Sequence, residues 1–144
     1  MDATPAADTV CGRFNELELH DSRFLGMTIV KREEPPGHDI SIDLAVLRGS
    51  YPQFSWEPAQ LVFTDSTYVR LDFDLDGKSN CGDAISTSKC VERSELRDAL
   101  EKGPMRYEQN PLAGYVHFSI FLIPPGGELH VFASDFMLKW VQSS

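Results

Sequence analysis

Residues 114–140 read GYVHFSIFLIPPGGELHVFASDFMLKW and form the longest apolar run in the chain. From Val116 to Leu122 one face of an extended chain carries only apolar side chains, a period of two that is typical of a β-strand. The Pro-Pro-Gly-Gly sequence at 124–127 interrupts the run, and His117, His130 and an aspartate lie within it, which argues against a membrane span. The pattern predicts a long β-hairpin at or near the centre of a sheet.

The second half of this hairpin changes its pattern near Asp135. Apolar positions are odd-numbered up to Ala133 and even-numbered from Phe136 onward. Because successive side chains of a strand point to opposite faces, such a switch usually marks a bulge or a change of sheet face. We expect a distortion of the backbone at residues 134–135.

Two more hairpins are expected earlier in the chain. Alternating residues at 23–32 and 40–46 flank the turn sequence EEPPG, and alternating residues at 59–64 and 67–75 flank Asp-Ser. An irregular connection is expected over 49–58, with its aromatic residues capping one end of the core.

A change of period then indicates one helix near residues 91–102. Leu96, Ala99 and Leu100 fall on one helical face, and Gly103 followed by Pro104 ends it. Residues 76–88 are rich in Gly, Ser, Asn and Asp and are expected to form a loop. Residues 1–10 are small and polar and are expected to be a disordered leader.

These elements predict a mainly β protein of the α+β class. About six long antiparallel strands follow one another as hairpins, with one helix between the fourth and the fifth. We expect a single domain over 11–144, built as a curled sheet, a sandwich or a barrel-like sheet. A curled sheet that encloses an open cavity is one alternative, and it suggests small-molecule binding.

The charge of the chain bears on its partners. A net charge of −9, from 22 acidic and 13 basic residues, disfavours nucleic acid, whose binding depends on Lys and Arg. The same charge favours a basic protein partner. No signal peptide is indicated at the start of the sequence, and three cysteines without a Cys-x-x-Cys pair favour a reducing, cytoplasmic location.

One segment matches a calcium loop in spacing. Residues 72–83 read DFDLDGKSNCGD, which places oxygen-bearing residues at the ligand positions of an EF-hand, namely Asp72, Asp74, Asp76, Asn80 and Asp83. If instead a strand continues through Leu75, its first three carboxylates spread over about 13 Å, too far for one ion. A smaller cation site at Asp76, Asn80 and Asp83 survives this objection. On the strand interpretation, Asp72 and Asp74 form an acidic face for a basic partner.

Catalytic patterns are poorly represented. His20, Asp21 and Ser22 have the residue types of a hydrolytic triad, but sequence neighbours do not generally form one. His117 and His130 are expected to lie nearly opposite each other across the last hairpin, and spacing indicates no third ligand that would complete a zinc site. The sequence therefore predicts binding rather than catalysis, with no cofactor other than the calcium alternative.

The segment ELHDSRFLGMTIV at 18–30 enters the first expected strand through a His-Asp-Ser step. With the meander of strands that follows, it resembles small bacterial immunity proteins of polymorphic-toxin systems and uncharacterised β-rich domains found beside them. The likeness covers about the first third of the chain. It implies a non-enzymatic binder, and an acidic immunity protein that meets a basic toxin agrees with the charge. No functional residue is carried over.

Overall fold

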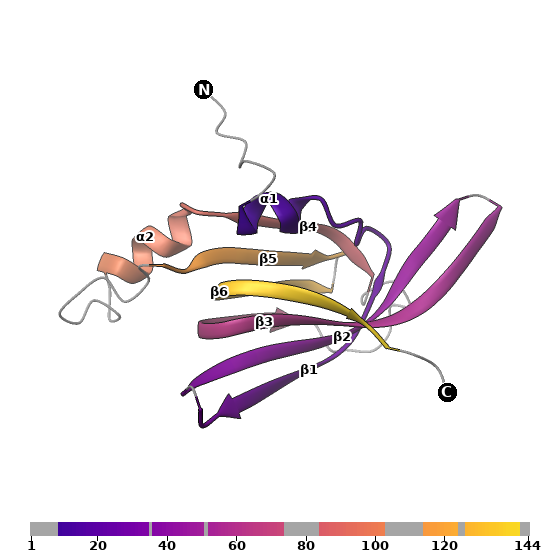
Figure 1. Ribbon diagram of the computed structural model, residues 1–144. Coiled ribbons are helices and arrows are strands. Elements are labelled where there is room, and N and C mark those ends of the chain that lie inside the picture. Colours follow the sequence, from indigo (N-terminus) through magenta and orange to yellow (C-terminus); the bar gives the residue numbers. More distant parts are fainter. Residues whose placement is uncertain are drawn as a thin grey trace.

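The computed structural model describes residues 9–34, 36–50, 52–73, 84–102, 114–123 and 126–141. These residues form two short helices and one six-stranded antiparallel sheet with the order β1-β2-β3-β6-β5-β4 (Figure 1). The predicted fold class, mainly β with six antiparallel strands, is confirmed. The elements are α1 (Val10–Asn15), β1 (Arg23–Arg32), β2 (Gly37–Ser50), β3 (Gln53–Phe73), β4 (Ile85–Val91), α2 (Glu95–Lys102), β5 (Val116–Leu122) and β6 (Gly127–Trp140).

The hairpin predicted at 114–140 forms as β5–β6 and lies inside the sheet. Ser119 of β5 pairs with His130 of β6, and β6 pairs on its other side with β3 along almost its whole length. The predicted first hairpin, β1–β2, is also present. Helix α2 agrees with the helix expected near 91–102, and Ser94 caps it by accepting the N–H of Arg97 at 3.1 Å.

The third predicted hairpin is wrong. Residues 59–64 and 67–73 belong to one strand, β3, which is 21 residues long and begins at Gln53, inside the expected irregular connection. The Asp-Ser pair bends this strand instead of reversing it. Asp65 adopts a positive φ of 54° and its N–H donates to the Asp39 carboxylate at 3.0 Å, so a side chain of β2 satisfies the backbone at the bend.

The sixth strand is β4, and most of its sequence, ISTSKCV, lies within the segment 76–88 that is expected to form a loop. It lies at an edge of the sheet, where the exposed Thr87 and Lys89 and the half-buried Ser86 and Ser88 are tolerated. A register shift between Ile85 and Thr87 also breaks its alternation, so its two fully buried residues, Ile85 and Cys90, differ in parity. Period-based reasoning misses a strand of this kind.

A distortion is expected in β6 at residues 134–135, but the irregularity lies in β3, the strand that pairs with β6 there. Strand β6 continues without interruption from Gly127 to Trp140, whereas β3 shifts register between Ser66 and Tyr68. Thr64 and Ser66, on either side of the bend, pair with Asp135 and Ala133. The apolar residues of β6 therefore switch from odd-numbered to even-numbered positions at the place where β3 bends.

This bend lets the sheet curl until its two edges touch. Arg23 at the start of β1 forms a bridge to Ala84, directly before β4, although the two strands lie at opposite ends of the strand order. Phe24 packs edge-on against Phe73 of β3 at 4.9 Å. The sheet is not closed along its length, so of the predicted architectures the curled sheet is the one observed.

Helix α1 fills the concave side of the curled sheet. Phe14 is fully buried, and its ring centroid lies 4.9 Å from Phe118, 5.1 Å from Phe136 and 6.1 Å from Phe63. Because a helix of six residues is not stable alone, this contact with three strands holds α1 in place. Within the described ranges, neither helix has the length and apolar character that crossing a bilayer requires.

Candidate functional site: a groove beside the β2–β3 arm

The hairpin of β2 and β3 extends beyond the rest of the sheet (Figure 1). Strand β1 pairs with β2 only up to Ala45, and β6 pairs with β3 only from Ala59 onward. Beyond these residue pairs the hairpin consists of β2 and β3 alone, with no third strand beside it. We call this part, residues 46–50 and 52–58, the arm. From residue 48 onward every described residue of the arm is exposed.

Both tryptophans of the chain lie at the arm and are half-exposed. Trp56, on the arm itself, is 51% exposed, and Trp140, at the end of β6 beside the root of the arm, is 44% exposed. Phe54 is 50% exposed on the same hairpin. Exposed tryptophan and phenylalanine at a projecting element are typical of an interaction surface, where large aromatic side chains anchor a partner.

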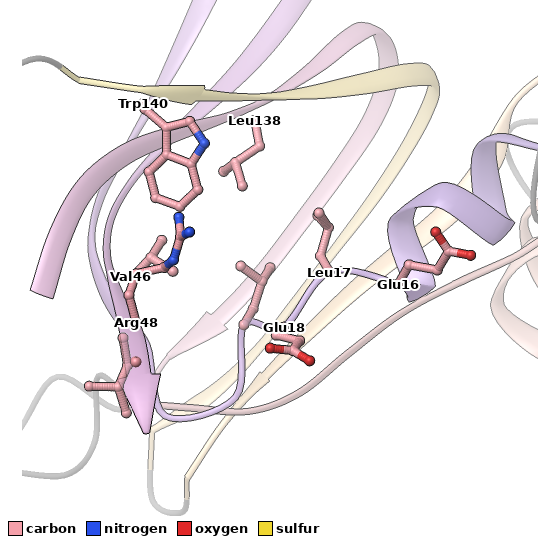
Figure 2. A pocket seen from close by; sticks show the side chains of 10 residues that line it. Glu16, Leu17, Glu18, Val46, Arg48, Leu138 and Trp140 are labelled. Carbon is pink, nitrogen blue, oxygen red and sulfur yellow. The ribbon is translucent and has the colours of Figure 1, made fainter. Parts of the chain in front are cut away.

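A groove of about 360 Å³ lies between the arm and the segment that follows α1 (Figure 2). Its volume is in the range of ligand-binding clefts, about 300–1,000 Å³. It is lined by Glu16, Leu17, Glu18, Leu19, Val46, Leu47, Arg48, Gly49, Leu138 and Trp140, and we call it the arm groove. Six of these ten residues have apolar side chains.

One side of the arm groove carries a guanidinium stacked on an indole. The Arg48 Cζ atom lies 4.6 Å from the centroid of the Trp140 ring, and Arg48 Nη1 lies 3.5 Å from a carboxylate oxygen of Glu57. The side chains of Arg48 and Glu57 are both 49% exposed, so solvent weakens their attraction. Figure 2 shows Glu16 and Glu18 on the other side of the groove.

The segment that carries Glu16 and Glu18 is held at both ends. At one end the Asn15 side chain is bonded to the backbone of Cys90 in β4. At the other end Asp21 N–H donates to Ile85 O at 2.8 Å, and the Ser22 hydroxyl accepts the N–H of Leu47 at 3.1 Å. These bonds fix the backbone that carries the two glutamates beside the arm.

A second cavity of about 530 Å³ continues from the arm groove toward β4. The two share Leu47, Gly49 and residues 17–19, and the second reaches Phe54 and residues 86–88 of the edge strand. Gly49 adopts a φ of 94°, and a Cβ atom there would overlap the backbone carbonyl of Gln53. The two cavities together form a continuous surface around the root of the arm.

The predicted partner and metal residues lie elsewhere or outside the described residues. Asp72 is exposed in β3 and pairs with Glu128 of β6, and it is absent from the lining of the arm groove. The other residues of the calcium-loop prediction, Asp74, Asp76, Asn80 and Asp83, lie outside the described residues. Among the residues that are described, no group of three or more His, Cys, Asp or Glu side chains is arranged to hold a metal ion.

His117 and His130 meet on the convex face, as predicted. His117 Nε2 lies 2.8 Å from His130 Nδ1, and the remaining nitrogens contact Ser94 Oγ at 2.8 Å and Glu128 Oε1 at 3.0 Å. Burial, with smaller contributions from the charges of His130 and Lys89, lowers the pKa of His117 to about 4. This neutral, 5% exposed imidazole joins the start of α2 to the sheet, which is a structural role.

The residues of the His20-Asp21-Ser22 step do not form a triad. His20 Nδ1 contacts the Asp21 carboxylate at 3.1 Å on the surface, whereas Ser22 is fully buried and its hydroxyl accepts the N–H of Leu47.

Cys90 is a free, buried thiol. Its hydrogen bond with Cys11, together with burial, raises its pKa, so this thiol stays protonated and unreactive.

Sequence reasoning missed the arm because residues 49–58 contain two prolines. The available signal was the spacing of Phe54, Trp56 and Pro58, every second position, which is the period of a strand.

Comparison of this chain with protein-family models, with curated proteins and with solved structures found no match.

Proposed function

We propose that this protein is a non-enzymatic binding domain that takes a basic protein partner at the arm groove. The observation that carries the proposal is the position of both tryptophans, half-exposed at one projecting hairpin, beside a groove that also presents carboxylates. Aromatic side chains at the centre of an interface supply most of its affinity, and the charges around them select the partner.

Charge supports a basic partner. The chain carries a formal charge of −9, and Glu16, Glu18 and Glu57 are exposed at the groove and the arm. Such a field accelerates the association of a basic protein, and the acceleration is lost as salt screens it. An immunity-like role, in which the domain blocks a basic toxin, is one form of this function and agrees with the resemblance of residues 18–30.

Titration with fluorescein-labelled octa-lysine tests the proposal. We expect binding that weakens with added salt, and a loss of affinity in the double variant Glu16→Gln/Glu18→Gln. The matched control is Glu33→Gln/Glu34→Gln, which removes the same charge at the exposed β1–β2 turn, away from the groove. A second comparison is Asp72→Asn, on the acidic strand face predicted from the sequence.

The outcomes separate clearly. A larger loss in the groove double variant than in either comparison supports binding at the groove. Equal losses in both double variants indicate general charge attraction and overturn the assignment to the groove. A loss confined to Asp72→Asn moves the binding surface to the face of β3 and β6 that carries Asp72 and Glu128.

A further inference from the structure

We infer that the Trp140 face of the arm groove is a binding subsite for a guanidinium group, which Arg48 occupies in the free protein and an arginine side chain of the partner takes on binding. The inference rests on the proposed function and adds the chemistry of the recognised residue. It also makes Arg48 an internal competitor of the partner.

The contact of Arg48 with Trp140 shows that the subsite accepts a guanidinium. At 4.6 Å from the ring centroid, Arg48 lies well inside the distance of about 6 Å at which a cation is attracted to an aromatic face. Leu138 and Val46 line the groove beside the indole and offer apolar surface to the methylene stem of an arginine. The indole remains accessible, since Trp140 is 44% exposed, whereas Val46 is buried beneath it at 3%.

Arg48 is held weakly enough to be displaced. It lies on the two-stranded arm, where neither a third strand nor the core restrains it, and its ion pair with Glu57 is half-exposed at 3.5 Å. Surface ion pairs of this kind contribute little to stability. After displacement, Arg48 keeps access to Glu57 and to water, so the change costs little.

The opposite side of the groove favours arginine over lysine as the incoming group. Glu16 and Glu18 line this side, with the Glu18 carboxylate nearer to the indole in Figure 2, and a planar guanidinium stacks on an indole while it donates in-plane hydrogen bonds to a carboxylate. An ammonium group is a compact, strongly hydrated charge and cannot do both as well. The partner is therefore expected to present an arginine from a basic segment, and the neutral isostere citrulline is expected to fail.

The test uses Trp140 as its own reporter. In a Trp56→Phe background Trp140 is the remaining tryptophan, because the chain has two. Its fluorescence is titrated with hexa-arginine, hexa-lysine and hexa-citrulline. We expect hexa-arginine to change the emission at the lowest concentration, hexa-lysine at several-fold higher concentration, and hexa-citrulline to have no effect.

The decisive experiment removes the competitor, Arg48. Arg48→Gln is expected to tighten hexa-arginine binding several-fold, since the apparent affinity of a site rises with the fraction of molecules in which it is open. Arg93→Gln is the matched control, because it makes the same charge change at a 74% exposed position before α2. Circular dichroism confirms that each variant is folded.

Equal tightening by Arg48→Gln and Arg93→Gln means that net charge alone acts, and this overturns the inference. Weaker binding in Arg48→Gln also overturns it, because Arg48 then belongs to the binding surface. In both cases the proposed function stands if octa-lysine binding still depends on Glu16 and Glu18. Loss of that dependence, by contrast, removes the proposed function itself.

Discussion

The side chain of Asn15 is bonded to both backbone groups of Cys90. Asn15 Nδ2 donates to Cys90 O at 3.0 Å, and Cys90 N–H donates to Asn15 Oδ1 at 2.7 Å. A primary amide thus imitates one residue of a neighbouring strand and covers part of the exposed edge of β4. Since Asn15 ends α1 and directly precedes Glu16, the same pair of bonds positions the acidic side of the arm groove.

Asn15→Ala is predicted to lower the free energy of unfolding by about 2 kcal/mol, because it leaves a backbone donor and a backbone acceptor of Cys90 without these bonds. Urea denaturation measures the loss. Gln60→Ala is the control, since the bond of Gln60 to Asp43 lies on the surface and its loss is expected to cost about 0.5 kcal/mol or less. Similar small losses in both variants would show that the Asn15 bonds stabilise nothing.

Phe14→Ala is predicted to lower the free energy of unfolding by about 3–5 kcal/mol, as for other buried aromatic residues cut to alanine. The ring contacts Phe63, Phe118 and Phe136, which belong to three different strands, so the cavity left behind cannot collapse easily. Thermal unfolding followed by circular dichroism measures the change. A loss no larger than that of an exposed residue such as Leu25→Ala would mean that α1 is not part of the core.

The strands that the sequence predicted well are those that bury one face evenly. In β2, Ile40, Ile42, Leu44 and Val46 are all buried, and the intervening residues are not, so the period of two is visible in the sequence. In β5 Phe118, Ile120 and Leu122 are buried, and the polar residues between them, His117 and Ser119, are buried as well, so there the alternation of apolar and polar residue types marks the strand. Where one face meets a continuous core, the pattern of side chains is sufficient to identify the strand.

The errors arise where long-range contacts decide the structure. Asp65 resembles a turn residue, and whether it reverses or only bends the chain depends on Asp39, 26 residues earlier, which receives its N–H. From residue 48 onward the arm has no buried face, and two prolines interrupt it, so the period of Phe54, Trp56 and Pro58 is a weak signal. The groove joins residues 16–19, 46–49 and the end of β6, and this proximity follows from the curling of the sheet, which local patterns do not encode.

His117 gives the protein a predicted dependence on pH. Its pKa is about 4 in the folded protein and about 6.5 in the unfolded chain, so between these values the unfolded state binds the additional proton. Stability is therefore complete above pH 6.5 and falls as the pH is lowered toward 4, by about 3 kcal/mol from this group. Urea denaturation at a series of pH values measures the decline.

Variants separate His117 from the carboxyl groups that also titrate in this range. His117→Gln is expected to flatten the difference in stability between pH 6.5 and 4, while its stability at neutral pH is lower because the contacts with Ser94 and His130 are altered. His20→Gln removes a histidine whose side chain is 71% exposed and is expected to keep the full decline. An unchanged decline in His117→Gln would assign the pH dependence to other groups.

Gly127 is predicted to be the glycine least tolerant of a side chain in the central hairpin. It adopts a φ of 115° at the start of β6, and a Cβ atom there would overlap the backbone carbonyl of Asp72 in β3. Gly114 is the control, since its φ of 83° is also unfavourable for alanine but its added Cβ would meet open space. Gly114→Ala therefore carries the backbone strain alone, about 1 kcal/mol, whereas Gly127→Ala adds the overlap and is expected to cost about 3 kcal/mol or more. Urea denaturation of both variants measures the difference, and equal losses would show that β3 moves away from Gly127 without cost.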